Sequence, residues 1–257
     1  MTRQEFFETI KNNCNNEIEY LIELLKLRGF LFDTINGELC LNDSSYREDA
    51  KFLSELLTQC RCGSLIKKRV ILNAGANSTD LEKIFVESPP IEGVYEAAGG
   101  NSFKHRMHGE SVPAELLDNF IARYIKAIAA CNVLVSASCD GNHPGMNKIF
   151  IMTKERTSRI WHKLICTMCL AGRYNINWNS DCTAVEFDDT SKYSTYYEMN
   201  RAAEYLYANR QEIRGILNTV MKEMAGSFFL EHSAEEIEYK FIKRASELFC
   251  NSLLLQK

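Results

Sequence analysis

One stretch of the chain, residues 133–152, constrains the fold more than any other. Both of its ends are apolar and rich in β-branched residues, and its polar middle, from Cys139 to Lys148, contains Gly141 and Gly145. This pattern predicts two core strands joined by a loop that is too long for a tight hairpin. We therefore expect a sheet in the core, with a polar loop at the ends of its strands.

Local signals on both sides of this stretch predict further helices and strands. Thr2 and Ser233 each stand three residues before a glutamate, which is the pattern of a capping box at the start of a helix. Asn36-Gly37 lies between two short strand-like segments and predicts a tight hairpin turn. Because strand pairs follow one another directly along the chain, some pairing must be antiparallel, which favours an α+β fold.

Longer apolar patterns give the expected bounds and the domain organisation. Helical spacing predicts an opening helix up to Gly29, a helix from Pro113 to Ile128 and a helix from Tyr196 to Met224. Strand patterns predict a strand at Lys67–Asn73 and a strand pair at Tyr174–Trp178 and Thr183–Phe187. We predict a single domain, residues 1–257. It consists of a helix-hairpin-helix segment (1–62), a mixed, partly antiparallel central sheet packed by helices (63–191), and C-terminal helices (192–257).

The composition narrows the possible partners. A formal net charge of −4 argues against a broad nucleic-acid-binding surface, because counterion release needs clustered Lys and Arg. No apolar run approaches the roughly 20 residues of a spanning helix, and the amino terminus lacks the apolar stretch of a signal peptide. We therefore expect a cytoplasmic protein without a membrane partner, whose ten cysteines are mainly thiols.

Three of the five histidines lie in two polar, glycine-containing loops, each next to a predicted core strand. Loops held by a rigid sheet are common positions for binding and catalytic groups. The predicted catalytic residues of these loops are His105, His108, His143 and Asp140. The predicted ligand-binding residues, which can donate hydrogen bonds to a phosphate or carboxylate, are Asn101, Lys104, Arg106 and Lys148. The alternative is two solvated surface loops that contain ordinary histidines.

Several residues predict a metal ion, either Mg²⁺ or Zn²⁺. Glu186 and Asp188 alternate along a predicted strand and could hold Mg²⁺ near a phosphate, unless they only form a solvated strand end. Cys139 could join the loop histidines as a ligand of a transition metal. Another set lies on one helix face, where we expect it to pack in the core rather than bind a metal: His162, Cys166 and Cys169.

Together these features predict an enzyme that acts on a phosphorylated or nucleotide-like ligand, by phosphoryl or nucleotidyl transfer or by hydrolysis. Cationic side chains of the two loops would neutralise the anionic ligand, and the histidines would transfer a proton or hold a metal. Two alternatives stay open: a non-catalytic module whose terminal helices bind a protein partner, and a structural zinc-binding protein. The enzyme hypothesis depends on the two loops meeting in space.

Overall fold

The computed structural model describes residues 1–42, 47–73, 75–87, 114–141, 147–225, 233–252 and 254–255. Six predicted site residues lie outside these ranges: Asn101, Lys104, His105, Arg106, His108 and His143. The meeting of the two histidine loops therefore stays a prediction. The other predicted site residues lie within the described chain: Cys139, Asp140, Lys148, Glu186 and Asp188.

Two helices open the chain, α1 (Arg3–Asn12) and α2 (Glu17–Leu27). The predicted capping box at Thr2 is confirmed. The prediction of one continuous opening helix is wrong, because the Asn16 side chain accepts a hydrogen bond from the Glu19 N–H at 3.0 Å and begins a new helix. Asparagine side chains compete with backbone carbonyls for such N–H groups, so they favour helix starts over helix interiors.

The first sheet has four antiparallel strands in the order β1-β2-β4-β3. Its strands are β1 (Phe32–Ile35), β2 (Glu38–Leu41), β3 (Gly63–Ile66) and β4 (Arg69–Leu72). The turn at Asn36-Gly37 is confirmed, and both residues have a positive φ, of 53° and 80°. The strand predicted from Lys67 begins at Arg69 instead, because Lys67 has a φ of 58° and belongs to the turn of the second hairpin.

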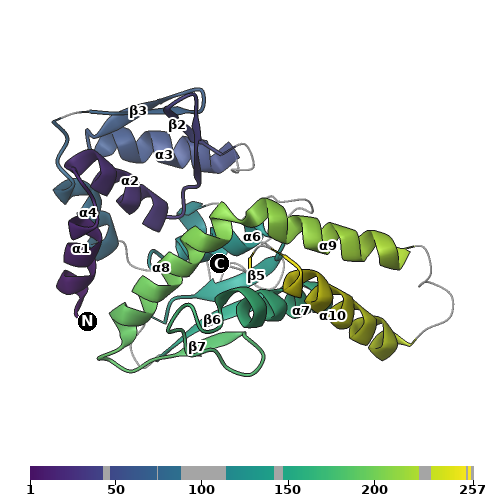
Figure 1. Ribbon diagram of the computed structural model, residues 1–257. Coiled ribbons are helices and arrows are strands. Elements are labelled where there is room, and N and C mark those ends of the chain that lie inside the picture. Colours follow the sequence, from purple (N-terminus) through teal and green to yellow (C-terminus); the bar gives the residue numbers. More distant parts are fainter. Residues whose placement is uncertain are drawn as a thin grey trace.

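Helix α3 (Arg47–Gln59) packs on this sheet beside β3, and α4 (Thr79–Glu87) packs on α2. Figure 1 shows these helices and the four strands together in one part of the molecule.

The second sheet has three antiparallel strands in the order β5-β6-β7. Its strands are β5 (Val135–Cys139), β6 (Lys148–Thr153) and β7 (Ala184–Glu186). The strand pair predicted within residues 133–152 is confirmed, with Cys139 opposite Phe150. Of the later predicted pair, only the second segment forms a strand, since Trp178 makes a single bridge to Val185.

The helices of this second part depart from the predicted bounds in two places. They begin with the short 3₁₀ helix η1 (Ala114–Leu116) and α6 (Ala122–Ala130), so the helix predicted from Pro113 starts later, at Ala122. The single helix predicted from Tyr196 to Met224 is two helices, α8 (Lys192–Ala208) and α9 (Arg210–Ala225), which meet at Asn209.

The remaining helices follow the sequence signals more closely. α7 (Arg156–Leu164) continues into a π-helical turn, η2 (Ile165–Leu170), before Gly172. α10 (Ala234–Cys250) begins at the predicted capping box of Ser233. In Figure 1, α8 crosses the molecule between the two parts, and α9 and α10 extend side by side away from the second sheet.

The α+β class is confirmed, with antiparallel strand pairs and helical segments at both ends; the strands form two sheets. One hydrophobic cluster runs through both parts, from Phe6 on α1 and Leu53 on α3 to Ile149 on β6 and Phe249 on α10. Helix α6 joins them, and all 9 of its residues are buried. Among the described helices, none has both the length and the apolar character that crossing a membrane requires.

A buried ion pair fixes residues 114–117, which precede α6. Lys126 on α6 contacts Asp49 on α3, and the two side chains are 1% and 0% exposed. The other carboxylate oxygen of Asp49 accepts a hydrogen bond from the Ala114 N–H at 2.6 Å. Arg28 donates hydrogen bonds to three of its carbonyl groups. These bonds position Asp118, which follows directly.

Candidate functional site

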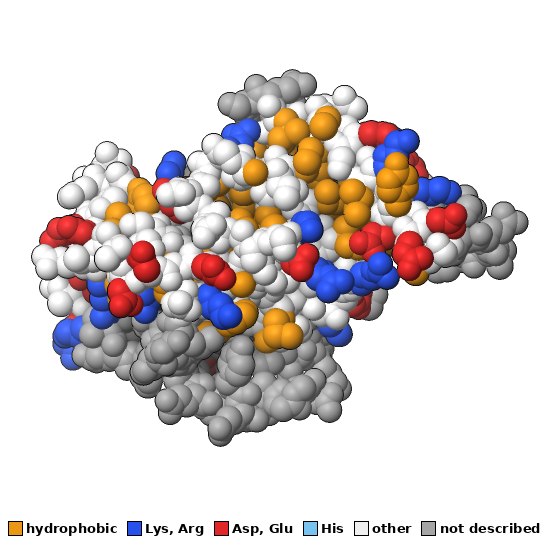
Figure 2. Space-filling view, turned by 90° about the horizontal axis from the view of Figure 1, so that it is seen from below, with side chains coloured by type: hydrophobic (Ala, Val, Ile, Leu, Met, Phe, Trp, Pro, Cys, Tyr) orange, Lys and Arg blue, Asp and Glu red, His pale blue; other side chains and the backbone are white. Residues whose placement is uncertain are grey.

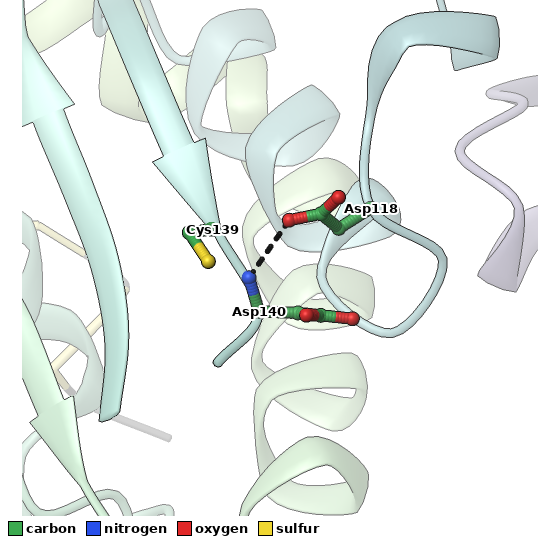
Figure 3. Close-up of side chains that lie close together, drawn as sticks. All are labelled: Asp118, Cys139 and Asp140. Carbon is green, nitrogen blue, oxygen red and sulfur yellow. Dashed lines mark hydrogen bonds between the residues drawn. The ribbon is translucent and has the colours of Figure 1, made fainter. Parts of the chain in front are cut away.

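Three possible metal ligands meet at the carboxyl end of β5. They are Asp118, from the turn before α6, and Cys139 and Asp140, from the end of the strand. One ligand atom of each residue, a carboxylate oxygen or the Cys139 Sγ, lies within 4.8 Å of the other two. Figure 3 shows the Asp118 carboxylate facing the strand end, where its Oδ2 accepts the Asp140 N–H at 2.9 Å.

The local sequence explains why Asp118 reaches this place. Its backbone carbonyl accepts the N–H groups of Ile121 and Ala122, at 3.3 and 3.0 Å, so it begins the turn that leads into α6. Aspartate is favoured at the first position of such turns. Its carboxylate is thereby held at the start of a buried helix and directed to the neighbouring strand end.

Gly141 closes the strand end onto β6. It has a φ of +71°, a backbone conformation that residues other than glycine rarely adopt. A Cβ at this position would collide with the Lys148 carbonyl oxygen. The same Cβ would lie 2.9 Å from the ring of Phe187. Only glycine therefore lets the backbone after Asp140 pass so close to the start of β6.

Tyr196 on α8 holds the backbone of the site in place. Its hydroxyl donates a hydrogen bond to the Asp140 carbonyl oxygen at 2.6 Å. Its ring stacks on Phe120, with ring centroids 4.8 Å apart. Burial raises the pKa of this hydroxyl well above its ordinary value, so it stays a neutral donor. The position of the Asp140 backbone is thus tied to α8 as well as to Asp118.

Cys139 is a buried thiol, 3% exposed. Burial raises its pKa to about 11, the Gly141 N–H acts in the opposite direction, and the carboxylates of Asp118 and Asp140 raise it further. A neutral thiol is a poor nucleophile, because the thiolate is the reactive form. This environment therefore suits a ligand that a metal ion would deprotonate better than it suits a free nucleophile.

Lys148 and Glu186 lie near the same end of the second sheet. They are opposite each other on β6 and β7. The Lys148 ammonium lies 4.8 Å from the centroid of the Phe150 ring, on the same strand. Because the Gly141 backbone approaches the Lys148 carbonyl so closely, the first residue of β6 is a neighbour of the three-residue cluster.

Asp188 has several hydrogen bonds at the start of α8. Its carboxylate accepts the N–H groups of Thr190 and Ser191 at 2.9 and 2.7 Å, and also bonds both hydroxyls. Hydrogen bonds from Thr190 and then Ser191 lower its pKa to about 2. These hydrogen bonds explain why an aspartate stands at this turn, and they do not require a metal ion. A ligand role for Asp188 or Glu186 stays a prediction.

The buried helix face of His162, Cys166 and Cys169 packs in the core, as expected. Burial lowers the pKa of His162 to about 4, and its Nε2 lies 3.1 Å from the Tyr124 hydroxyl and 3.5 Å from the Cys166 Sγ. The Asp118–Cys139–Asp140 cluster is the only group of its kind in the part of the chain that the structure describes. No other three His, Cys, Asp or Glu residues there have ligand atoms close enough to hold one metal ion.

The sequence pattern predicts Cys139 and Asp140 as site residues but does not indicate Asp118. Asp118 lies inside the helix that was predicted from Pro113. An aspartate in a helix interior is expected on the solvent-exposed face, so the pattern gave no reason to place it in a site. The signal that was available is the dipeptide Asp118-Asn119, since both residue types favour turns and helix starts. Comparisons of this chain with protein-family models, with curated proteins and with solved structures found no match.

Proposed function

We propose that this protein is a metal-dependent enzyme that acts on a phosphorylated or nucleotide-like ligand, with its site at the carboxyl end of β5. The observation that carries the proposal is the convergence of Asp118, Cys139 and Asp140, whose ligand atoms lie within 4.8 Å of one another. Two of these residues are less than 5% exposed, so the donors are held in place by the fold.

The donor set favours Zn²⁺ over Mg²⁺. Magnesium prefers oxygen ligands with octahedral geometry, whereas zinc accepts thiolate and carboxylate ligands together. Three protein ligands would leave a position for water or for a ligand oxygen, as in catalytic zinc sites. Bound there, the metal would supply a Lewis acid for phosphoryl or nucleotidyl transfer or for hydrolysis.

The residues around the cluster suit an anionic ligand. Lys148 begins the strand that the Gly141 backbone contacts, and its charge can neutralise a phosphate oxygen. His143 lies in the short segment between these two residues, and we expect it to transfer a proton or complete the metal site. Lys104, His105, Arg106 and His108 would join if their loop reaches the same place.

Metal analysis tests the proposal. We expect the purified protein to bind one equivalent of Zn²⁺, and Asp118→Asn, Asp140→Asn and Cys139→Ser each to weaken binding by at least about 100-fold, because first ligands matter more than their supporting groups. The matched control is Asp181→Asn, since Asp181 is 68% exposed and pairs with Lys163 across 3.6 Å.

Activity is then screened with phosphate monoesters, nucleotides and sugar phosphates, with zinc and with a chelator. The proposal predicts turnover that needs zinc and falls in the three cluster variants but not in Asp181→Asn. Absence of stoichiometric zinc binding, or turnover that is identical in all four variants, would contradict it.

One observation favours a second candidate, the protein-interaction module. Tyr239 and Ile242 on α10 and Met221 on α9 are large hydrophobic residues that are 67%, 37% and 48% exposed. Figure 2 shows hydrophobic side chains gathered toward the end of the molecule that carries α10, with charged side chains beside them. Exposed apolar patches with a charged rim are typical of interfaces.

This candidate predicts no zinc binding and no turnover. It also predicts self-association or partner binding that the double variant Tyr239→Ser, Ile242→Ser abolishes without lowering the melting temperature. Sedimentation of the purified protein, with and without the double substitution, measures the self-association. Unchanged sedimentation together with zinc-dependent turnover would leave only the enzyme.

A further inference from the structure

A cavity lies between the two parts of the molecule, away from the Asp118–Cys139–Asp140 cluster. Its volume is about 500 Å³, it is open to solvent on one side, and its lining comes from α1, α2, the β1–β2 hairpin, α6 and α8. Pockets of a few hundred cubic ångströms at such junctions are the usual places for small-molecule ligands. Nothing in the proposed zinc chemistry uses this cavity.

The charges that line the cavity neutralise one another. Arg123, with a side chain only 9% exposed, pairs with Glu23 at 3.0 Å and lies 3.9 Å from Glu204. Burial acts to raise the pKa of Glu23, but Arg123 and Lys26 hold it below its ordinary value, so this carboxylate stays ionised. A cavity whose cations are already matched by carboxylates does not call for a strongly anionic ligand such as a polyphosphate.

Asn200 supplies a hydrogen-bond acceptor for a ligand. It lines the cavity, it is 5% exposed, and its Nδ2 donates to the carbonyl groups of Phe120 and Tyr196 at 3.2 and 2.8 Å. Its Oδ1 is buried and has no hydrogen-bond partner among the described residues. Leaving a buried amide oxygen unsatisfied costs about 1–3 kcal/mol, so a ligand donor that reaches Oδ1 would remove this cost.

The rest of the lining is mixed. Apolar side chains such as Ile10, Leu27 and Phe32 form one part. Tyr197, whose hydroxyl accepts a hydrogen bond from Asn13 at 3.2 Å, adds an aromatic ring with a polar tip. Such a surface suits a flat ring with polar substituents.

We propose that this cavity binds an uncharged, ring-containing small molecule of the nucleoside class, with an N–H group that donates to Asn200 Oδ1. The lysine and arginine charges of the lining already have carboxylate partners, the apolar side chains can pack on a ring, and the carboxylates and Arg201 offer hydrogen-bond partners for sugar hydroxyls. This site is independent of the zinc site and of the proposed reaction.

The probes are adenosine, guanosine, cytidine and uridine at millimolar concentration, with the purified full chain. At least one of them is expected to raise the melting temperature by about 2–4 °C. It should also slow alkylation of Cys14, which lines the cavity, by about tenfold when present at ten times its Kd. Cys250, exposed at the end of α10, is the internal control and should react at an unchanged rate.

Two neighbouring residues of β1 provide matched variants. Thr34 lines the cavity, whereas Ile35 does not and is 52% exposed, and successive strand residues point to opposite faces. Thr34→Trp should fill the cavity and abolish both effects, and Ile35→Trp should leave both intact. Zinc binding should be normal in both variants, which separates a failure here from a failure of the proposed enzyme.

The proposal is overturned if none of the four nucleosides changes the melting temperature or the Cys14 alkylation rate. It is also overturned if the effects persist in Thr34→Trp. Protection that appears only with nucleoside monophosphates would show that the cavity requires an anion, which contradicts the matched charges.

Discussion

The Asp49–Lys126 pair is buried and the Asp118–Cys139–Asp140 cluster is buried except for the half-buried Asp118; both lie next to α6, but their charges are arranged differently. In the first, a cation and a carboxylate of opposite charge are in contact, and both are at most 1% exposed. In the second, two carboxylates and a thiol converge. Convergent carboxylate and thiol groups are the ligands that a metal ion uses, whereas an ion pair in contact already satisfies its own charges. The difference separates a structural contact from a candidate binding site.

The two clusters are also connected. Arg28 donates hydrogen bonds to the carbonyl groups of Ala114, Glu115 and Leu117, and the Asp49 carboxylate accepts the Ala114 N–H. Burial lowers the pKa of Arg28 to about 10, and the carboxylates of Asp118 and Asp49 act to raise it. The structural pair therefore fixes the turn that presents Asp118 to the strand end.

The largest expected effect comes from breaking the structural pair. Lys126→Met leaves the Asp49 carboxylate buried without its cation, and we expect a loss of about 3–5 kcal/mol in the free energy of unfolding, measured with urea. Lys83→Met is the control, since the Lys83–Asp80 pair is 54% and 57% exposed and contributes at most about 1 kcal/mol. Equal losses in the two variants would show that the buried pair has no special role.

His162 extends the comparison to a buried group that stays neutral. Burial lowers its pKa from 6.5 to about 4, so the unfolded chain binds a proton there that the folded protein does not. Stability should therefore fall as the pH drops from 6.5 to 4, and this residue should account for roughly 3 kcal/mol of the loss. The difference in unfolding free energy between the wild type and His162→Gln should shrink by that amount over this pH range. A constant difference would contradict the assignment.

Gly141→Ala tests the strand end itself. The new Cβ would meet the Lys148 carbonyl at a φ of +71°, and we expect a loss of about 2 kcal/mol or more in unfolding free energy together with weaker zinc binding. Gly172→Ala is the control. Gly172 has nearly the same backbone conformation, with a φ of +74°, but a Cβ added there would meet no atom within 4 Å. It should lose about 1 kcal/mol and bind zinc normally. Similar results for both would mean that the close approach at Gly141 is unimportant.

The smallest effect on stability is expected at the candidate site. Asp118→Asn keeps an oxygen that accepts the Asp140 N–H and removes one negative charge. We expect the unfolding free energy of the metal-free protein to change by less than about 1 kcal/mol, because natural functional sites are not optimised for stability. Zinc affinity should nevertheless fall at least about 100-fold. A large loss of stability without a change in zinc affinity would make Asp118 structural.

Elements with local signals could be predicted from the sequence. The turn at Asn36-Gly37, the capping boxes at Thr2 and Ser233 and the strand pair within residues 133–152 were all correct. The helix breaks at Asn16 and Asn209 were not, because apolar periodicity continues across both. In these places a side chain that caps or ends a helix overrides the pattern.

The candidate site was predicted only in part. Cys139 and Asp140 are neighbours in sequence at the end of a strand, so their closeness is a local fact. Asp118 reaches them only because the buried bonds of Arg28 and Asp49 set the turn before α6. Contacts between distant segments of this kind leave no periodic signal in one sequence. The division of the strands into two sheets depends on long-range pairing in the same way.

X-ray absorption at the zinc edge of the protein with one equivalent of Zn²⁺ tests the central claim most directly. The account predicts one sulfur neighbour at about 2.3 Å with oxygen or nitrogen neighbours at about 2.0–2.2 Å, and loss of the sulfur in Cys139→Ser. A spectrum without sulfur in the wild type, or a sulfur signal that persists in Cys139→Ser, would contradict it.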